Sequence, residues 1–222
     1  MLCVTQLKTG RSVLPNFIYL VYDQLSKDAV LIDPGWDHDA LLDLIVRDDL
    51  TLRAILLTHA DSDHVQNIDL ITSKVPVPVY MTGIEIEDSG FRTPGLIACA
   101  HEQEVAAGSV RFTCLHTPGH TRGSACFLMG DLLFTGDTIF IEGCGYCCPP
   151  RGSPAAMFDS VNFLNHRVLS DVLVYPAHQY GLEPGVSMHT VKKRNIYFRI
   201  KNREAFINFS ERRGLPDFDT WA

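Results

Sequence analysis

Short apolar runs alternate with amphipathic segments along the chain, and this pattern predicts strands and helices in turn. In the first half, strands are expected over residues 17–22, 29–32 and 54–57, with a helix around residues 41–45. The run at 54–57 is continuously apolar, which is typical of a strand covered on both faces. A further strand is expected at residues 77–80, and Pro78 within it predicts an edge position, because proline cannot donate a ladder hydrogen bond.

The second half of the chain repeats this alternation. Strands are expected over residues 110–115, 125–129, 132–134 and 172–175. Residues 153–169 have a helical pattern, with Ser153 as a cap ahead of Pro154 at the first helical position, and residues 187–212 are mostly helical. The order indicates two β-rich halves with helices on their outer faces.

Composition limits the class of protein. The chain has 222 residues, of which 46% are apolar and 20% charged, as in one large globular α/β domain. A net charge of −7 argues against a nucleic-acid-binding protein, and every apolar run is too short to span a membrane. Pro15 and Asn16 interrupt the apolar N-terminal stretch, so it does not fit a secretory signal. With seven cysteines and no such signal, we expect reduced thiols and a cytoplasmic protein.

The segment Thr58 to His64 carries the strongest chemical signal. Four metal-capable side chains follow directly after the predicted buried strand: His59, Asp61, Asp63 and His64. A helix-capping turn would explain one aspartate and one histidine, but not two of each at this spacing. Ligand sites of α/β proteins usually lie where strands end, so this segment predicts a metal site.

Three more polar residues follow predicted strands further along the chain. His120, Asp137 and His178 each come shortly after an apolar strand. Each alone fits an ordinary loop residue. Imidazole suits zinc and iron, and a carboxylate can span two divalent ions, so together they extend the predicted site.

The motifs around these residues resemble those of the metallo-β-lactamase superfamily, and in particular its glyoxalase II-like, or hydroxyacylglutathione hydrolase-like, branch. They cover nearly the whole chain, at residues 31–35, 55–59, 117–121, 133–138, 143–145 and 175–178. Residues 143–150 and the tail at 195–197 are also similar to small acyl hydrolases of polyketide and nonribosomal peptide gene clusters.

The resemblance implies an α/β (α+β) fold, namely a four-layer αββα sandwich with a two-metal site between the sheets. Residues 1–222 would form one domain with a short helical extension at about 187–222. By position, one metal would be held by His59, Asp61 and His120, the other by Asp63, His64 and His178, with Asp137 bridging them.

Asp61 departs from the family pattern, because most relatives have histidine there. A third ligand carboxylate lowers the net positive charge of the site and moves its preference from zinc toward iron or manganese. The flavodiiron branch has a glutamate at this position, so a carboxylate can serve as the ligand. Two zinc ions remain the first expectation, with iron or manganese as alternatives.

Residues near the expected site offer further contacts. Cys144, Cys147 and Cys148 form a Cys-x-x-Cys loop that either packs as reduced thiols or holds a metal or redox pair. By resemblance this loop borders the substrate thiol, so Tyr146, and also Tyr180, are candidate substrate contacts. The basic residues between 192 and 203 fit either a solvated helix face or contacts to an anionic carrier.

The resemblance favours a metal-dependent hydrolase of acyl thioesters, with a small acyl substrate on glutathione, a coenzyme or a carrier protein. Two metals would lower the pKa of a bound water toward ~7, and Asp63 would orient the resulting hydroxide or accept its proton. A thiol has a pKa of ~8.5, so the leaving group needs no strong acid. The alternatives are an iron-dependent oxidoreductase, such as a persulfide dioxygenase, and a binding protein without activity. Neither nucleic acid nor membrane is expected as a partner.

Overall fold

The computed structural model describes residues 1–9 and 16–213, and the chain forms two six-stranded sheets. Sheet A is built in the order β1-β2-β3-β4-β5-β6 and sheet B in the order β12-β11-β10-β9-β8-β7. The elements of the first half are β1 (Leu2–Thr9), β2 (Asn16–Asp23), β3 (Asp28–Ile32), α1 (His38–Arg47), β4 (Thr51–Leu56), α2 (Ser62–Val65), α3 (Ile68–Lys74), β5 (Val79–Thr82), α4 (Gly83–Ser89) and β6 (Leu96–Cys99). Those of the second half are β7 (Gln103–Ala107), β8 (Val110–His116), β9 (Ala125–Met129), β10 (Leu132–Gly136), α5 (Pro154–Arg167), β11 (Leu173–Pro176), β12 (Val186–Ser187), α6 (Met188–Arg194), α7 (Ile196–Arg199) and α8 (Arg203–Arg213).

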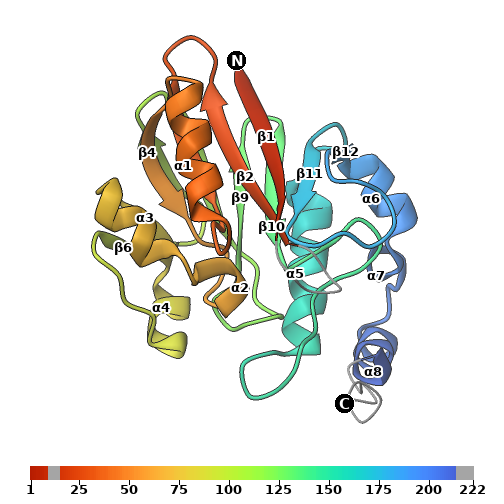
Figure 1. Cartoon of the computed structure of the whole chain (residues 1–222). Helices are drawn as coiled ribbons and strands as arrows, with labels where there is room; N and C mark the ends of the chain where they lie inside the picture. Colours follow the sequence, from red (N-terminus) through yellow and green to blue (C-terminus); the bar gives the residue numbers. More distant parts are fainter. Residues whose placement is uncertain (10–15, 214–222) are drawn as a thin grey trace.

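Strand direction follows the connections within each sheet. In sheet A the strands from β3 to β6 are parallel, while β1 and β2 pair antiparallel with their neighbours. In sheet B only β10 and β11 are parallel. The helices α1 to α4 lie on one side of the molecule and α5 to α8 on the other (Figure 1). Two β-rich halves with outer helices, as the sequence predicts, are confirmed.

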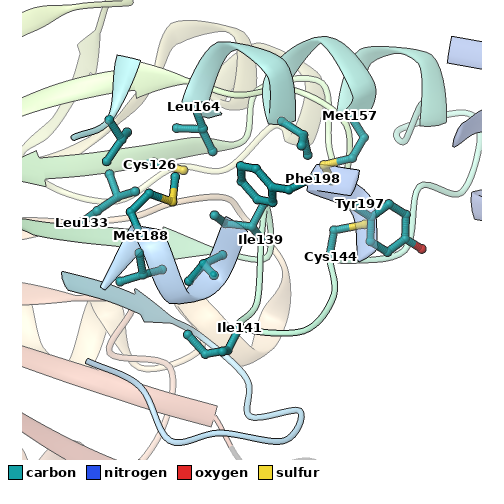
Figure 2. Packing of buried hydrophobic residues seen from close by; sticks show 14 of the residues in the cluster. Cys126, Leu133, Ile139, Ile141, Cys144, Met157, Leu164, Met188, Tyr197 and Phe198 are labelled. Carbon is teal, nitrogen blue, oxygen red and sulfur yellow. The ribbon is translucent and has the colours of Figure 1, made fainter. Parts of the chain in front are cut away.

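Three buried clusters fill the spaces between the four layers. The middle cluster joins the two sheets, because alternate residues of β2 such as Tyr19 face Phe127 and Phe134 of sheet B. The residues between them, such as Leu20, face α1 and α3 instead. Figure 2 shows the third cluster, in which sheet B packs against α5, α6 and α7. The four-layer αββα sandwich is therefore confirmed, and burial on both faces explains the continuous apolar runs.

Element predictions held where the apolar pattern was strong. Ser153 caps α5 by accepting a hydrogen bond from the backbone N–H of Ala156 at 3.2 Å, with Pro154 at the first helical position. The edge position predicted for residues 77–80 is wrong. β5 begins after Pro78 and pairs with both β4 and β6, so the proline lies outside the ladder. Sheet A ends instead at β6, a strand that the sequence pattern did not predict.

The C-terminal segment is helical up to residue 213, and residues 214–222 of the expected extension lie outside the described residues. Among residues 1–9 and 16–213, no helix combines the length and apolar character needed to cross a membrane.

Candidate metal centre

All seven predicted ligand side chains meet where strands of both sheets end. His59 and Asp61 follow β4, and Asp63 and His64 lie in α2 immediately after them. His120 follows β8, Asp137 follows β10 and His178 follows β11. Parallel strands end at the same edge of a sheet, and the packing of the sheets brings the two edges together.

The ligand atoms form two groups, each lying within 4.8 Å of one another. One group is His59, His120 and Asp137, and the other is Asp63, His64 and His178. The two oxygens of Asp137 face both groups: Oδ2 lies 3.7 Å from His120 Nε2, while Oδ1 lies 3.4 Å from His178 Nε2. A carboxylate with this placement suits a bridge between two cations.

Asp61 lies beside the first group but outside its set of convergent atoms. Its Oδ2 is 3.1 Å from His120 Nε2 and 3.7 Å from His59 Nε2. Its other oxygen, Oδ1, accepts a hydrogen bond from Arg151 at 2.6 Å. The structure thus places all seven residues together and directs one oxygen of Asp61 away from the histidines.

The chemistry of the donor set fits divalent ions. Among the described residues, His59 Nε2, His64 Nε2 and Asp137 Oδ1 are buried without a hydrogen-bond partner, although polar atoms in protein interiors are normally paired. Two imidazole nitrogens and a carboxylate oxygen left in this way, facing one another, are what a metal ion would satisfy.

The surroundings shift the pKa values of the histidines of the centre in opposite directions. Burial lowers the pKa of His59 well below its usual value, and His64 and His120 lower it further. Burial also opposes protonation of His64 and His120. The nearby carboxylates outweigh it, with Asp33 raising the pKa of His64 to about 10 and Asp61 raising that of His120 to about 9. The carboxylates of the centre thus favour a nearby positive charge. A bound cation would supply that charge in place of protons on His64 and His120.

Asp33, directly after β3, orients both histidines of the first segment. It accepts hydrogen bonds from the backbone N–H and the hydroxyl of Thr58, at 2.8 and 2.6 Å. The same hydroxyl lies 3.0 Å from His59 Nδ1, and Asp33 Oδ2 lies 3.0 Å from His64 Nδ1. Nδ1 of His59 contacts the Thr58 hydroxyl and Nδ1 of His64 faces the Asp33 carboxylate, so each ring presents Nε2 to the centre.

Asn16 and Gly35 fix the position of Asp63. The side-chain amide of Asn16 donates to Asp63 Oδ2 at 2.9 Å and to the Asp63 carbonyl at 3.0 Å. A Cβ atom at Gly35 would lie 1.9 Å from that same carbonyl oxygen, so only glycine allows this approach. The candidate catalytic carboxylate is therefore held from two sides.

The loop of residues 143–152 packs on the centre mainly through its backbone. The carbonyl of Tyr146 lies 2.7 Å from His120 Nδ1, and its half-exposed side chain stands at the loop surface. Cys144 and Cys147 are buried in the cluster of Figure 2, whereas Cys148 is exposed. No cysteine belongs to a metal-capable group among the described residues, so the packing interpretation fits this loop better.

The remaining predicted contacts lie further from the ligand atoms. Tyr180 packs on Phe140, with ring centroids 4.9 Å apart, and Phe140 in turn packs edge-on to His178 at 5.7 Å. In the basic stretch, Lys192 donates to two carbonyls near the end of α5, those of Asn165 and Val168. That lysine therefore supports helix packing.

The supporting residues Asn16, Asp33, Glu85 and Arg151 were not assigned to the site from the sequence. Asp33 could have been found, since it opens a turn directly after a strand. Glu85 and Arg151 stand in segments without metal-ligand spacing, and their distance from the ligands in sequence left no signal.

Known proteins share this architecture and much of this sequence. The sequence pattern of the Metallo-beta-lactamase superfamily matches residues 11–94. The chain is 40% identical to "Probable polyketide biosynthesis zinc-dependent hydrolase BaeB" of Bacillus velezensis, covering 95% of this chain and 93% of that protein. It is 28% identical to a "Hydroxyacylglutathione hydrolase-like protein" of Gallus gallus, covering 85% and 69% of the two chains. The crystal structure of ETHE1 from Myxococcus xanthus superposes with a TM-score of 0.85 at 30% identity, covering 97% and 92%. The chain therefore belongs to the metallo-beta-lactamase superfamily.

Proposed function

We propose that the protein is a metal-dependent hydrolase of acyl thioesters. The observation that carries this proposal is the pair of ligand groups joined by Asp137, with buried imidazole and carboxylate atoms left for a cation. The names of the relatives, a zinc-dependent polyketide biosynthesis hydrolase and a hydroxyacylglutathione hydrolase-like protein, support hydrolysis of a small acyl substrate.

We assign the ligands by the two groups. His59, Asp61 and His120 would hold one ion, Asp63, His64 and His178 the other, and Asp137 would bridge them. Zinc is the first expectation, with iron or manganese as alternatives. When bound, divalent ions supply a water of lowered pKa and an electrostatic partner for oxygen that gains negative charge.

Residues of the chain itself would position the attacking water and remove its proton. Asp63, fixed by Asn16, would accept the proton of the attacking water through Oδ2, which faces His178 Nε2 at 3.5 Å. The thiolate product leaves without protonation, so every histidine of the centre is available for metal binding. Tyr146 and Tyr180 would contact the acyl or thiol part of the substrate. The single-domain organisation, the cytoplasmic location and a carrier-bound substrate stay predictions.

The decisive experiment combines elemental analysis with hydrolysis of an acyl thioester of N-acetylcysteamine, followed by thiol release. We expect about two divalent ions per chain and turnover, and a loss of ~10²-fold or more in kcat for Asp63→Asn. Asp69→Asn, on the exposed face of α3, is the matched control and should retain full activity. A metal-loaded protein that releases no thiol would contradict the proposal.

An iron-dependent oxidoreductase is the second candidate, and the carboxylate of Asp61 is the observation that favours it. One iron per chain, with oxygen uptake on a persulfide and no thioester hydrolysis, would replace the first proposal by this one.

A further inference from the structure

Arg151 joins the predicted ligand Asp61 to a buried carboxylate outside the metal centre. Its Nη1 donates to Asp61 Oδ1 at 2.6 Å, and its Nη2 donates to Glu85 Oε1 at 3.1 Å. The arginine stands at the end of the 143–152 loop, 90 residues from Asp61, and Glu85 lies in the first turn of α4. Three segments distant in sequence therefore meet at one guanidinium group.

Glu85 is a rigid anchor for this arginine. Its side chain is completely buried and accepts hydrogen bonds from the backbone N–H groups of Ala60 and Gly123, at 3.0 and 3.1 Å. It also accepts one from the hydroxyl of Thr121 at 2.6 Å. A buried carboxylate needs a charged partner, and Arg151 supplies it. Because Glu85 is held by its neighbours, it fixes the plane of the guanidinium fork.

The fork in turn determines how Asp61 meets the centre. With Oδ1 bound to Arg151, only Oδ2 faces His59 and His120. A carboxylate restricted in this way offers one donor atom, as an imidazole does. A carboxylate without such a partner can bind through both oxygens, which suits larger ions with more ligands than tetrahedral zinc.

We propose that Arg151, anchored by Glu85, is a positioning residue that keeps Asp61 a single-oxygen donor and so favours zinc over manganese at the first metal position. The proposal rests on the metal centre described under the proposed function.

The test is a double-mutant cycle read out by metal affinity, with no need for activity. Zinc and manganese affinities are measured by chelator competition for the wild type, Arg151→Ala, Asp61→His and the double variant. We expect Arg151→Ala to lower the ratio of zinc to manganese affinity about tenfold, and the same change in the Asp61→His background to alter it less than about twofold. Arg122→Ala serves as the matched control. Arg122 lies in the loop between β8 and β9 and pairs with Asp88 of α4.

Two outcomes would overturn the inference. Equal effects of Arg151→Ala in both backgrounds would mean that the arginine does not act through Asp61, and an unchanged ratio would mean that it does not affect selectivity. If Arg151→Ala fails to fold, Arg151→Met combined with Glu85→Gln removes both charges together and answers the same question. A wild type that binds neither metal would refute the proposed centre itself, whereas a zinc-binding wild type with an unchanged ratio in the variant refutes the inference alone.

Discussion

Four of the seven proposed ligands are held by residues that do not themselves face the metal position. Asp33 orients His59 and His64, Asn16 holds Asp63, and the Tyr146 carbonyl contacts His120. Such outer contacts fix ring tautomers and carboxylate rotamers before a metal binds. We therefore expect the reactivity of the proposed centre to depend on side chains that a search for ligands would overlook.

Asn16→Ala tests this dependence directly. Removing the amide takes both hydrogen bonds from Asp63, so we expect thioester turnover to fall about 10- to 100-fold. Steady-state kinetics at equal metal content measure the loss. Asn162→Ala removes an amide that bonds only within α5, to the Phe158 carbonyl, and should leave turnover unchanged. Equal rates for wild type and Asn16→Ala would remove Asn16 from the working site.

The difference in predictability at this scale has a physical cause. Few residue types can bind divalent ions, so a cluster of them after a strand is recognisable from the sequence. His59 and Asp63 belong to such a cluster. Their supporting groups are ordinary. In the sequence, Asn16 only interrupts an apolar stretch and Glu85 is an unexceptional polar residue. The packing of distant segments gives them a role.

At the scale of elements, Asn195 joins the C-terminal helices to the loop that follows β10 and the proposed ligand Asp137. Its buried amide donates to the carbonyls of Phe140 and Gly143, at 2.9 and 2.7 Å. Its oxygen caps α7 by accepting from the backbone N–H of Tyr197 at 2.9 Å. One side chain thus satisfies three backbone groups.

We expect Asn195→Ala to cost about 3 kcal/mol of unfolding free energy, because the Phe140 carbonyl loses its side-chain donor, the Gly143 carbonyl loses one of two donors and α7 loses its cap. Urea denaturation measures this loss, provided that the dependence of the unfolding free energy on urea concentration is unchanged. Asn202→Ala removes an exposed bond to the N–H of Ala205 at the next helix start and should cost only about 1 kcal/mol. Similar losses in the two variants would show that the buried carbonyls contribute little.

Element predictions succeeded where both faces of a strand are covered, as in β3 and β9, since burial forces a continuous apolar run. They failed for β6 and β7, whose side chains are largely exposed and carry no such pattern. The short helix α4 follows β5 at once and buries the charged residue Glu85, which no periodicity of apolar residues reveals.

At the scale of the whole molecule, Asp28 connects the two sheets. It is the first residue of β3, whereas Asp33 follows the other end of that strand. It accepts from Arg53 Nε within sheet A and from the backbone N–H of Ser109 at 2.8 Å, in the turn between β7 and β8. The Arg53 guanidinium, followed by the Ser109 N–H, lowers the pKa of Asp28. The folded state therefore favours the ionised carboxylate.

This linkage gives a stability difference that depends on pH. A lowered pKa stabilises the fold above the unfolded value of about 3.9, and the contribution disappears as pH falls through the lower folded value. Asp28→Asn should therefore lower the melting temperature at pH 7, with a gap to the wild type that narrows below about pH 4. Melting curves at pH 7, 5 and 3 decide this, with Asp43→Asn on the exposed face of α1 as control. A gap of the same size at pH 3 would contradict the linkage.

Metal removal should lower the free energy of unfolding of the whole protein, because ions that bind only the folded state stabilise it. Ions held at about 100 times their dissociation constant contribute about 2.7 kcal/mol, so chelation should lower the melting temperature by about 5–10 °C. Differential scanning calorimetry before and after chelation measures the shift, and restored zinc should reverse it. An unchanged melting temperature would mean that no ion is held tightly.

Each sheet comes from one continuous half of the chain, β1 to β6 and then β7 to β12. The proposed ligands divide in the same way, with four before residue 100 and three after it. The first half therefore carries every strand of sheet A but only part of each ligand group, because His120, Asp137 and His178 lie in the second half. We therefore expect metal binding at the proposed centre to require that the ribosome has delivered nearly the whole polypeptide and that its two halves have joined.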